Sequence, residues 1–211
     1  MLKTLFDAMG GKAAPQTYEI PLFPLGTVLF PGGVLPLRIF EQRYMDMAKS
    51  CLKNGAPFGV CLIREGKEVG VPAVPEGVGT QARIEDFDMA QLGVLQVRTI
   101  GGDRFRVLDT RVLDNGLIIG NVEPLGADTP IETAPEFTDC RNFLSLVLGK
   151  IGADRYHGEA RLDDPSWVSF RITELLPIST AIKQKMLELT DAKMRLEILH
   201  RVLKQQGLLA G

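Results

Sequence analysis

A chain of 211 residues, with 45% hydrophobic and 24% charged side chains, is long enough to bury a core without disulfides or a structural metal. Its formal net charge of −2 argues against a nucleic acid as the main partner, because phosphate-binding surfaces leave an excess of basic residues. No apolar run reaches the roughly 18–20 residues of a membrane span, and the first residues lack the apolar segment of a secretory signal. We therefore expect a cytoplasmic protein with no membrane contact.

The cysteines are odd in number and widely spaced, at Cys51, Cys61 and Cys140. This usage predicts reduced, buried thiols in a reducing compartment. The alternative is a reactive thiol, which would need a base, and only His157 and His200 are available.

The first part of the chain predicts a flexible tail at residues 1–16 and a β-rich subdomain at residues 17–125, where short apolar segments are bounded by turn residues. The expected strands are Tyr18–Leu22, Val34–Ile39, Phe58–Ile63, Gly79–Phe87, Val94–Ile100, Arg104–Leu108 and Leu117–Val122.

Prolines interrupt the apolar stretch Ile20–Tyr44 at short intervals. An internal proline breaks a helix and leaves a gap in the ladder of a central strand. We therefore expect short edge strands and extended pieces here. A helix follows over Glu41–Lys53, because apolar residues recur at helical spacing until Asn54 and Gly55.

The clearest predicted hairpin is Val94–Leu108. Apolar and polar side chains alternate on both sides of Gly101 and Gly102, and two glycines at a turn supply the positive φ that a tight hairpin demands. On such a hairpin, Arg98, Arg104 and Arg106 share one face.

Residues 126–135 have the composition of a linker, and residues 136–207 change to a helical period. The expected helices are Phe137–Ile151, one that opens at Asp164-Pro165 and ends before Pro177, one capped by Ser179 that runs to about Leu189, and one capped by Asp191 over Ala192–Gln206, which stops at Gly207. Because strands come first and helices afterwards, the pattern predicts an α+β fold and not alternating βαβ units.

The sequence lacks the phosphate loop of nucleotide-binding proteins, the Gly-x-Ser-x-Gly elbow and the His-Glu-x-x-His zinc motif. We expect neither a cofactor nor a metal. Two alternatives remain open: acid–base chemistry by Glu85, Asp86 and Asp88, and phosphate or acidic-peptide contacts by the arginines of the hairpin.

Several motifs occur in an order that resembles the LON substrate-binding domain, the N-terminal domain of the ATP-dependent protease Lon, which also occurs alone in bacterial proteins and within RING-finger proteins and cereblon. The motifs are Pro21–Leu25, Val28–Gly32, Leu35–Tyr44 with its Ile-Phe-Glu-x-Arg-Tyr form, Gly79–Ile84, Gly102–Val107, Val122–Leu125, Leu175–Pro177, Lys185–Leu189 and Arg195–Leu199. The Ile-Phe-Glu-x-Arg-Tyr form resembles the stand-alone and RING-associated versions more than Lon itself.

The resemblance covers about residues 18–206 and implies a β-rich, PUA-like pseudobarrel followed by a C-terminal helical bundle. In Lon this region helps to recognise unfolded or damaged proteins, and the ATPase and protease domains lie downstream of it. We expect the recognition module without those domains.

The leading hypothesis is a non-catalytic protein-binding module for unfolded or exposed hydrophobic segments, or an adaptor for a protease encoded elsewhere. RNA binding is the second hypothesis, because PUA-like folds also bind RNA, and an enzyme acting through Glu85, Asp86 and Asp88 is the third. The candidate binding or family-motif residues are Phe40, Glu41, Arg43, Tyr44, Met45, Met89 and Arg104.

Overall fold

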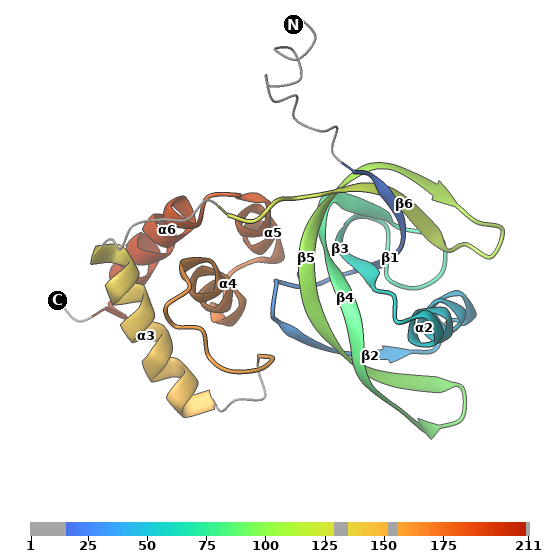
Figure 1. Cartoon of the computed structure of the whole chain (residues 1–211), viewed down its shortest axis with the longest axis horizontal. Coiled ribbons are helices and arrows are strands. Elements are labelled where there is room, and N and C mark those ends of the chain that lie inside the picture. Colours follow the sequence, from blue (N-terminus) through green and yellow to red (C-terminus); the bar gives the residue numbers. More distant parts are fainter. Residues whose placement is uncertain (1–15, 129–134, 152–155, 210–211) are drawn as a thin grey trace, which may run out of the picture.

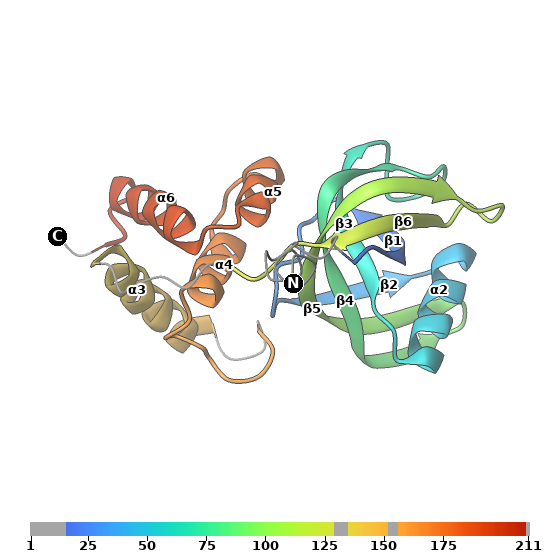
Figure 2. The same cartoon turned by 45° about the horizontal axis from the view of Figure 1, so that its top comes forward.

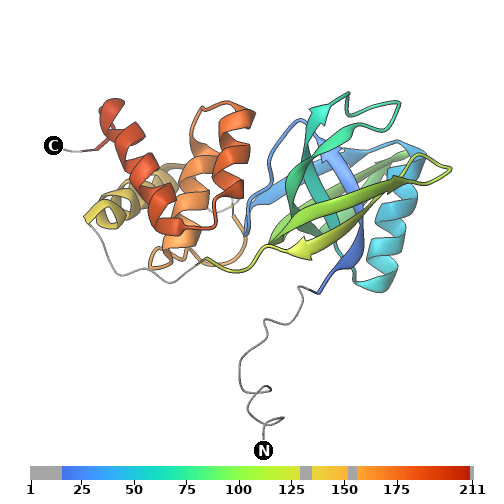
Figure 3. The same cartoon turned by 90° about the horizontal axis from the view of Figure 1, so that it is seen from above.

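The computed structural model describes residues 16–128, 135–151 and 156–209. A ring of strands and a group of helices lie next to each other (Figures 1, 2 and 3). The predicted α+β fold is therefore confirmed. The expected tail, apart from residue 16, and residues 129–134 of the expected linker lie outside the described residues.

The ring is a six-stranded sheet in the order β2-β5-β4-β3-β1-β6, and a further pairing between β5 and β6 closes it. The strands are β1 (Tyr18–Leu25), β2 (Val34–Ile39), β3 (Phe58–Glu65), β4 (Val74–Gln91), β5 (Val94–Val112) and β6 (Ile118–Pro124). β2 lies outside the closed part of the ring, because it pairs only with the first half of β5.

The predicted hairpin with a turn at Gly101 and Gly102 is wrong, because β5 runs through both residues without turning. Gly101 is needed for a close approach: a Cβ there would lie 2.1 Å from the carbonyl oxygen of Phe30. The two turns that flank β5 contain Gly93 and Gly116, with φ of 81° and 83°. The hairpins are therefore β4–β5 and β5–β6.

The expectation of edge strands is confirmed for β2 and wrong for β1, which lies between β3 and β6. β1 tolerates its prolines because its two halves pair on different sides. Tyr18–Leu22 pairs with β6 and Leu22–Leu25 with β3, so only Leu22 has partners on both sides. Each proline therefore lies in a part of the strand that is paired on one side only.

Helix α2 (Gln42–Asn54) confirms the helix expected after the proline-rich stretch, and Gly55 ends it in the left-handed conformation. One face of α2, including Tyr44, Met47 and Cys51, packs into the core of the ring against Phe58 and Val97. The apolar residues that recur at helical spacing in the sequence therefore form the face of α2 that is buried against the ring.

Four further helices form the second part: α3 (Pro135–Ile151), α4 (Pro165–Leu175), α5 (Thr180–Glu188) and α6 (Ala192–Gln205). The three predicted caps are confirmed, because the side chains of Asp164, Ser179 and Asp191 accept hydrogen bonds from backbone N–H groups of the first turn of each helix. In the part of the chain that the structure describes, no helix is long and apolar enough to cross a membrane.

Candidate functional site

The outer edge of β2 is an open backbone edge of the ring. Within the described residues β2 pairs with β5 and with no other strand. Two cavities lie against β2, and both are lined by Pro36, Leu37 and Arg38. A strand edge with cavities beside it is one of the arrangements by which proteins hold extended polypeptides.

The first cavity, which we call the β2–α2 pocket, has a volume of about 250 Å³ and lies among β1, β2, the start of α2 and the β3–β4 loop. Buried Phe23, Leu25 and Tyr44 contribute to its lining. Two exposed apolar residues also line it: Phe40, which is 56% exposed, and Val69, which is 55% exposed.

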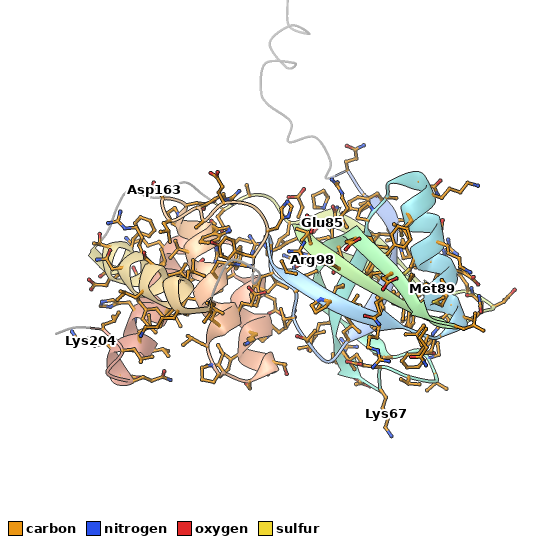
Figure 4. All side chains as sticks on the ribbon, turned by 90° about the horizontal axis from the view of Figure 1, so that it is seen from below. Lys67, Glu85, Met89, Arg98, Asp163 and Lys204 are labelled. Carbon is orange, nitrogen blue, oxygen red and sulfur yellow. The ribbon has the colours of Figure 1, made fainter. Side chains whose placement is uncertain are left out.

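The second cavity, the hairpin pocket, has a volume of about 470 Å³ and lies over β2, β4 and β5. Its lining includes Phe87, which is 58% exposed. Met89 lies farther along the β4–β5 hairpin and is 50% exposed (Figure 4). We call the surface of the two pockets, together with Met89, the β2 face.

The motif residues that follow Phe40 build the support of this face. Arg43 forms an ion pair with Glu41 at 2.9 Å and donates a hydrogen bond to the carbonyl oxygen of Gly116 at 3.1 Å, which ties α2 to the β5–β6 turn. Tyr44 stacks on Phe23 with ring centroids 4.0 Å apart, and burial raises its pKa. Arg43 and Tyr44 are buried, as is Met45, which leaves Met45 little surface for a partner.

Arg104 lies away from the β2 face, in the contact between ring and helices. Its guanidinium donates to the carbonyl oxygens of Leu187 and Leu189, at 2.8 and 2.6 Å, and to Asp128 at 2.8 Å. Arg195 also binds Asp128, whose side chain is 4% exposed. We call Arg104, Asp128 and Arg195 the joint.

The charges of the joint are mutually compensated. Burial alone would raise the pKa of Asp128, but hydrogen bonds from Arg195 and Ser166 and the charges of both arginines bring it below its ordinary value. Burial lowers the pKa of Arg104, which the charge of Asp128 opposes. Two buried cations that share one carboxylate hold the helices against the ring.

Arg98, Arg104 and Arg106 do not form one exposed basic surface, because each has a different environment. Arg98 forms an ion pair with Glu85, Arg106 forms one with Glu123, and Arg104 is buried. With two of the charges paired at the surface and one removed from it, the structure offers no concentrated basic surface here for a nucleic acid.

The carboxylates of the expected acidic cluster also separate. Glu85 binds Arg98 and lies 2.8 Å from His157 Nδ1, whereas Asp86 and Asp88 line the hairpin pocket. Since the three groups do not converge on one point, they lack the geometry of an acid–base pair.

The cysteines are free and buried, as the sequence predicts. Burial raises the pKa of Cys61 and of Cys140 to about 12 and also raises that of Cys51. A thiol with a raised pKa is a poor nucleophile near neutral pH, which contradicts the reactive-thiol alternative.

The role of Asp128 could not be predicted from the sequence, because Asp128 falls in the expected linker and its partners lie far along the chain. One signal was present: Arg195 interrupts the apolar residues of the last helix beside Leu196, and a buried cation requires a compensating partner. No local signal identifies Phe87 as exposed.

The fold and the motifs define a substrate-binding domain of the Lon type. The family model of the ATP-dependent protease La (LON) substrate-binding domain matches residues 19–205, and the chain belongs to this family.

Among curated proteins, Lon protease of Xanthomonas oryzae pv. oryzae is 25% identical over 197 residues, which span 89% of this chain and 23% of that protein. Protein cereblon of Xenopus tropicalis is 27% identical over 111 residues, 51% of this chain and 24% of that protein. The chain therefore matches about a quarter of the length of either relative.

Two solved structures are also similar. A Lon N-terminal domain protein from Xanthomonas campestris is 41% identical with a TM-score of 0.72, and the match covers 86% of this chain and 96% of that one. The N-terminal domain of Lon protease from the Mycobacterium avium complex shares the fold, with a TM-score of 0.62 at 16% identity and the same coverage of both chains.

Proposed function

We propose that this protein is a non-catalytic module that binds exposed apolar segments of other polypeptides at the β2 face. Membership of a substrate-binding family supports polypeptides as the ligand class. The observation that carries the proposal is the pair of pockets that share Pro36, Leu37 and Arg38, each with an exposed phenylalanine in its lining.

Exposed aromatic side chains beside cavities are typical of binding surfaces, because they offer a large apolar area with few rotatable bonds. In this proposal Phe40 and Phe87 contact the client, and Met89 adds an adaptable apolar contact. Glu41, Arg43 and Tyr44 fix the backbone that presents Phe40. Clients are unfolded cytoplasmic proteins, which the module passes to a protease on a separate chain.

The test is a titration of fluorescein-labelled, reduced and carboxymethylated α-lactalbumin with the purified protein, followed by anisotropy. We expect saturable binding that native α-lactalbumin does not show. Phe40→Ser and Phe87→Ser should each weaken binding by about tenfold, since each removes a large apolar contact.

Leu146→Ser is the matched control. Leu146 is 70% exposed, lies on α3 and lines neither pocket, so its loss should leave the affinity unchanged. The proposal fails if the unfolded probe does not bind, or if the three serine variants weaken binding equally.

A further inference from the structure

We propose that the β2 face receives its client as an added β-strand that runs antiparallel to β2 and alternates apolar with basic side chains. This inference rests on the proposed function and specifies how the client is held and which segments are preferred. Three observations support it: a backbone bridge, the position of the pockets and the charge of the face.

The helical part of the molecule already adds a backbone to this edge of the sheet. Gly33, directly before β2, forms an isolated antiparallel bridge with Tyr156, and the N–H of His157 donates to the carbonyl oxygen of Gly32 at 3.3 Å. Gly32 and Gly33 also pair with Gly101 through hydrogen bonds of 2.7 and 2.9 Å. The backbone here is therefore paired on both sides.

Among the described residues, this pairing on the outer side stops at Gly33, and the six residues Val34–Ile39 pair with β5 alone. Tyr156 is held in place by an edge-to-face contact with Trp167, whose ring centroid is 5.4 Å away. The open edge that remains is roughly 20 Å long, because a strand rises about 3.3 Å per residue. This is the length of a client strand of about six residues.

The pockets are placed to receive side chains of such a strand. Successive side chains of a strand point to opposite faces of the sheet, so an added strand presents alternate residues to different surroundings. The β2–α2 pocket and the hairpin pocket both border Pro36–Arg38. Main-chain hydrogen bonds would hold the client, and the two pockets would select its side chains.

The charge of the face selects basic clients over acidic ones. Arg98, in the lining of the hairpin pocket, is neutralised by an ion pair with Glu85, which leaves Arg38 against Asp86 and Asp88. Glu41, in the lining of the β2–α2 pocket, is neutralised by an ion pair with Arg43, which leaves the carboxylate of Glu68. The sum is one cation, Arg38, against three carboxylates, so lysine or arginine beside the apolar residues is favoured.

The experiment uses the full chain and a fluorescein-labelled nonapeptide that alternates leucine with lysine, at low salt. A leucine–glutamate peptide of the same length tests the charge. Two N-methylated versions of the leucine–lysine peptide test for strand addition. One version is methylated at the odd-numbered backbone N–H groups and the other at the even-numbered groups, and we call these the two frames. In an added strand, the N–H groups of only one frame face β2.

We expect the lysine peptide to bind about fivefold or more tighter than the glutamate peptide. N-methylation in one frame should weaken binding about tenfold and in the other frame should change it little. Asp88→Lys should reduce the preference for lysine, whereas Asp114→Lys, an exposed carboxylate in the β5–β6 turn, should not.

Equal effects of the two N-methylation frames, or no effect of either, would overturn strand addition. Equal affinity for the two charge patterns would overturn the basic preference. If sedimentation shows dimers that Leu37→Pro abolishes, the edge is occupied by a second copy and the inference is wrong. In each case, the proposed function stands if unfolded α-lactalbumin still binds and its binding still depends on Phe40 and Phe87. If unfolded α-lactalbumin does not bind, the proposed function and this inference both fail.

Discussion

The joint and the β2 face differ in the kind of side chain that each buries or exposes. The joint buries three charged groups, Arg104, Asp128 and Arg195, and compensates each with the others. The β2 face leaves large apolar groups such as Phe40 and Phe87 more than half exposed to solvent. Both regions depart from the rule that apolar groups are buried and charges exposed.

The two departures have different explanations. A buried charge network contributes orientation and rigidity only if every member is present, so its residues respond to mutation through stability. Exposed apolar groups contribute little to folding, so mutation should affect binding instead. The same class of change is thus expected to act on stability in one region and on binding in the other.

The largest effect is expected for Asp128→Ala, which leaves Arg104 and Arg195 buried without their carboxylate. Breaking a buried charge network in this way should lower the free energy of unfolding by about 3–5 kcal/mol. Urea denaturation measures it. Asp109→Ala, at a carboxylate whose hydrogen bond is exposed, is the control and should have little effect. Equal effects of the two changes would mean that the joint does not orient the helices.

Two phenylalanines of the proline-rich stretch test the contrast within one segment. Phe30 is completely buried and packs on Phe170 at 5.7 Å between ring centroids, whereas Phe40 is 56% exposed. Phe30→Ala should lower the free energy of unfolding by about 3–5 kcal/mol, and Phe40→Ala by less than about 0.5 kcal/mol. Phe40→Ala should weaken peptide binding all the same. A large loss of stability from Phe40→Ala would assign this residue to the core.

Much of the fold follows from local sequence signals. The caps Asp164, Ser179 and Asp191 and the helical spacing of α2 depend on residues a few positions apart, and all were predicted correctly. The continuity of β5 does not depend on local residues. Gly101 resembles a turn glycine in sequence, but its role is set by the Phe30 carbonyl, which reaches it from a distant part of the chain.

The site is less predictable than the fold, because the motif that marks the family is mainly one of packing. Arg43, Tyr44, Met45 and Arg104 are buried in the structure, and only Phe40 and Met89 of the apolar candidates are exposed. Their part in binding stays a prediction. Exposure of a phenylalanine depends on which neighbours the ring brings close, and the sequence alone does not contain that information.

Substitution of Gly101, one of the two glycines of the predicted turn, should have an intermediate effect on stability. Gly101→Ala would place a Cβ 2.1 Å from the backbone oxygen of Phe30, whereas the nearest atom at Gly102 would be Gln81 Cβ at 3.5 Å. Gly101→Ala should therefore lower the free energy of unfolding by about 1–3 kcal/mol, and Gly102→Ala should change it by less than about 0.5 kcal/mol. Thermal or urea unfolding of the two variants measures the difference. If both are tolerated equally, the Phe30–Gly101 contact yields without loss.

The smallest effect concerns pH. The pKa of Asp128 is below its ordinary value of 3.8 in the folded protein, so the unfolded chain takes up the proton first as the pH falls. The stabilisation from Asp128 is therefore fully present well above pH 3.8 and is lost as the pH falls through the folded-state pKa. The difference in unfolding free energy between the wild type and Asp128→Asn should stay constant near neutral pH and shrink in acid. Urea titrations at several pH values test this, and a difference that grows in acid would contradict the charged joint. We do not expect peptide binding by the β2 face to follow the titration of Asp128, because the joint and the β2 face consist of different residues.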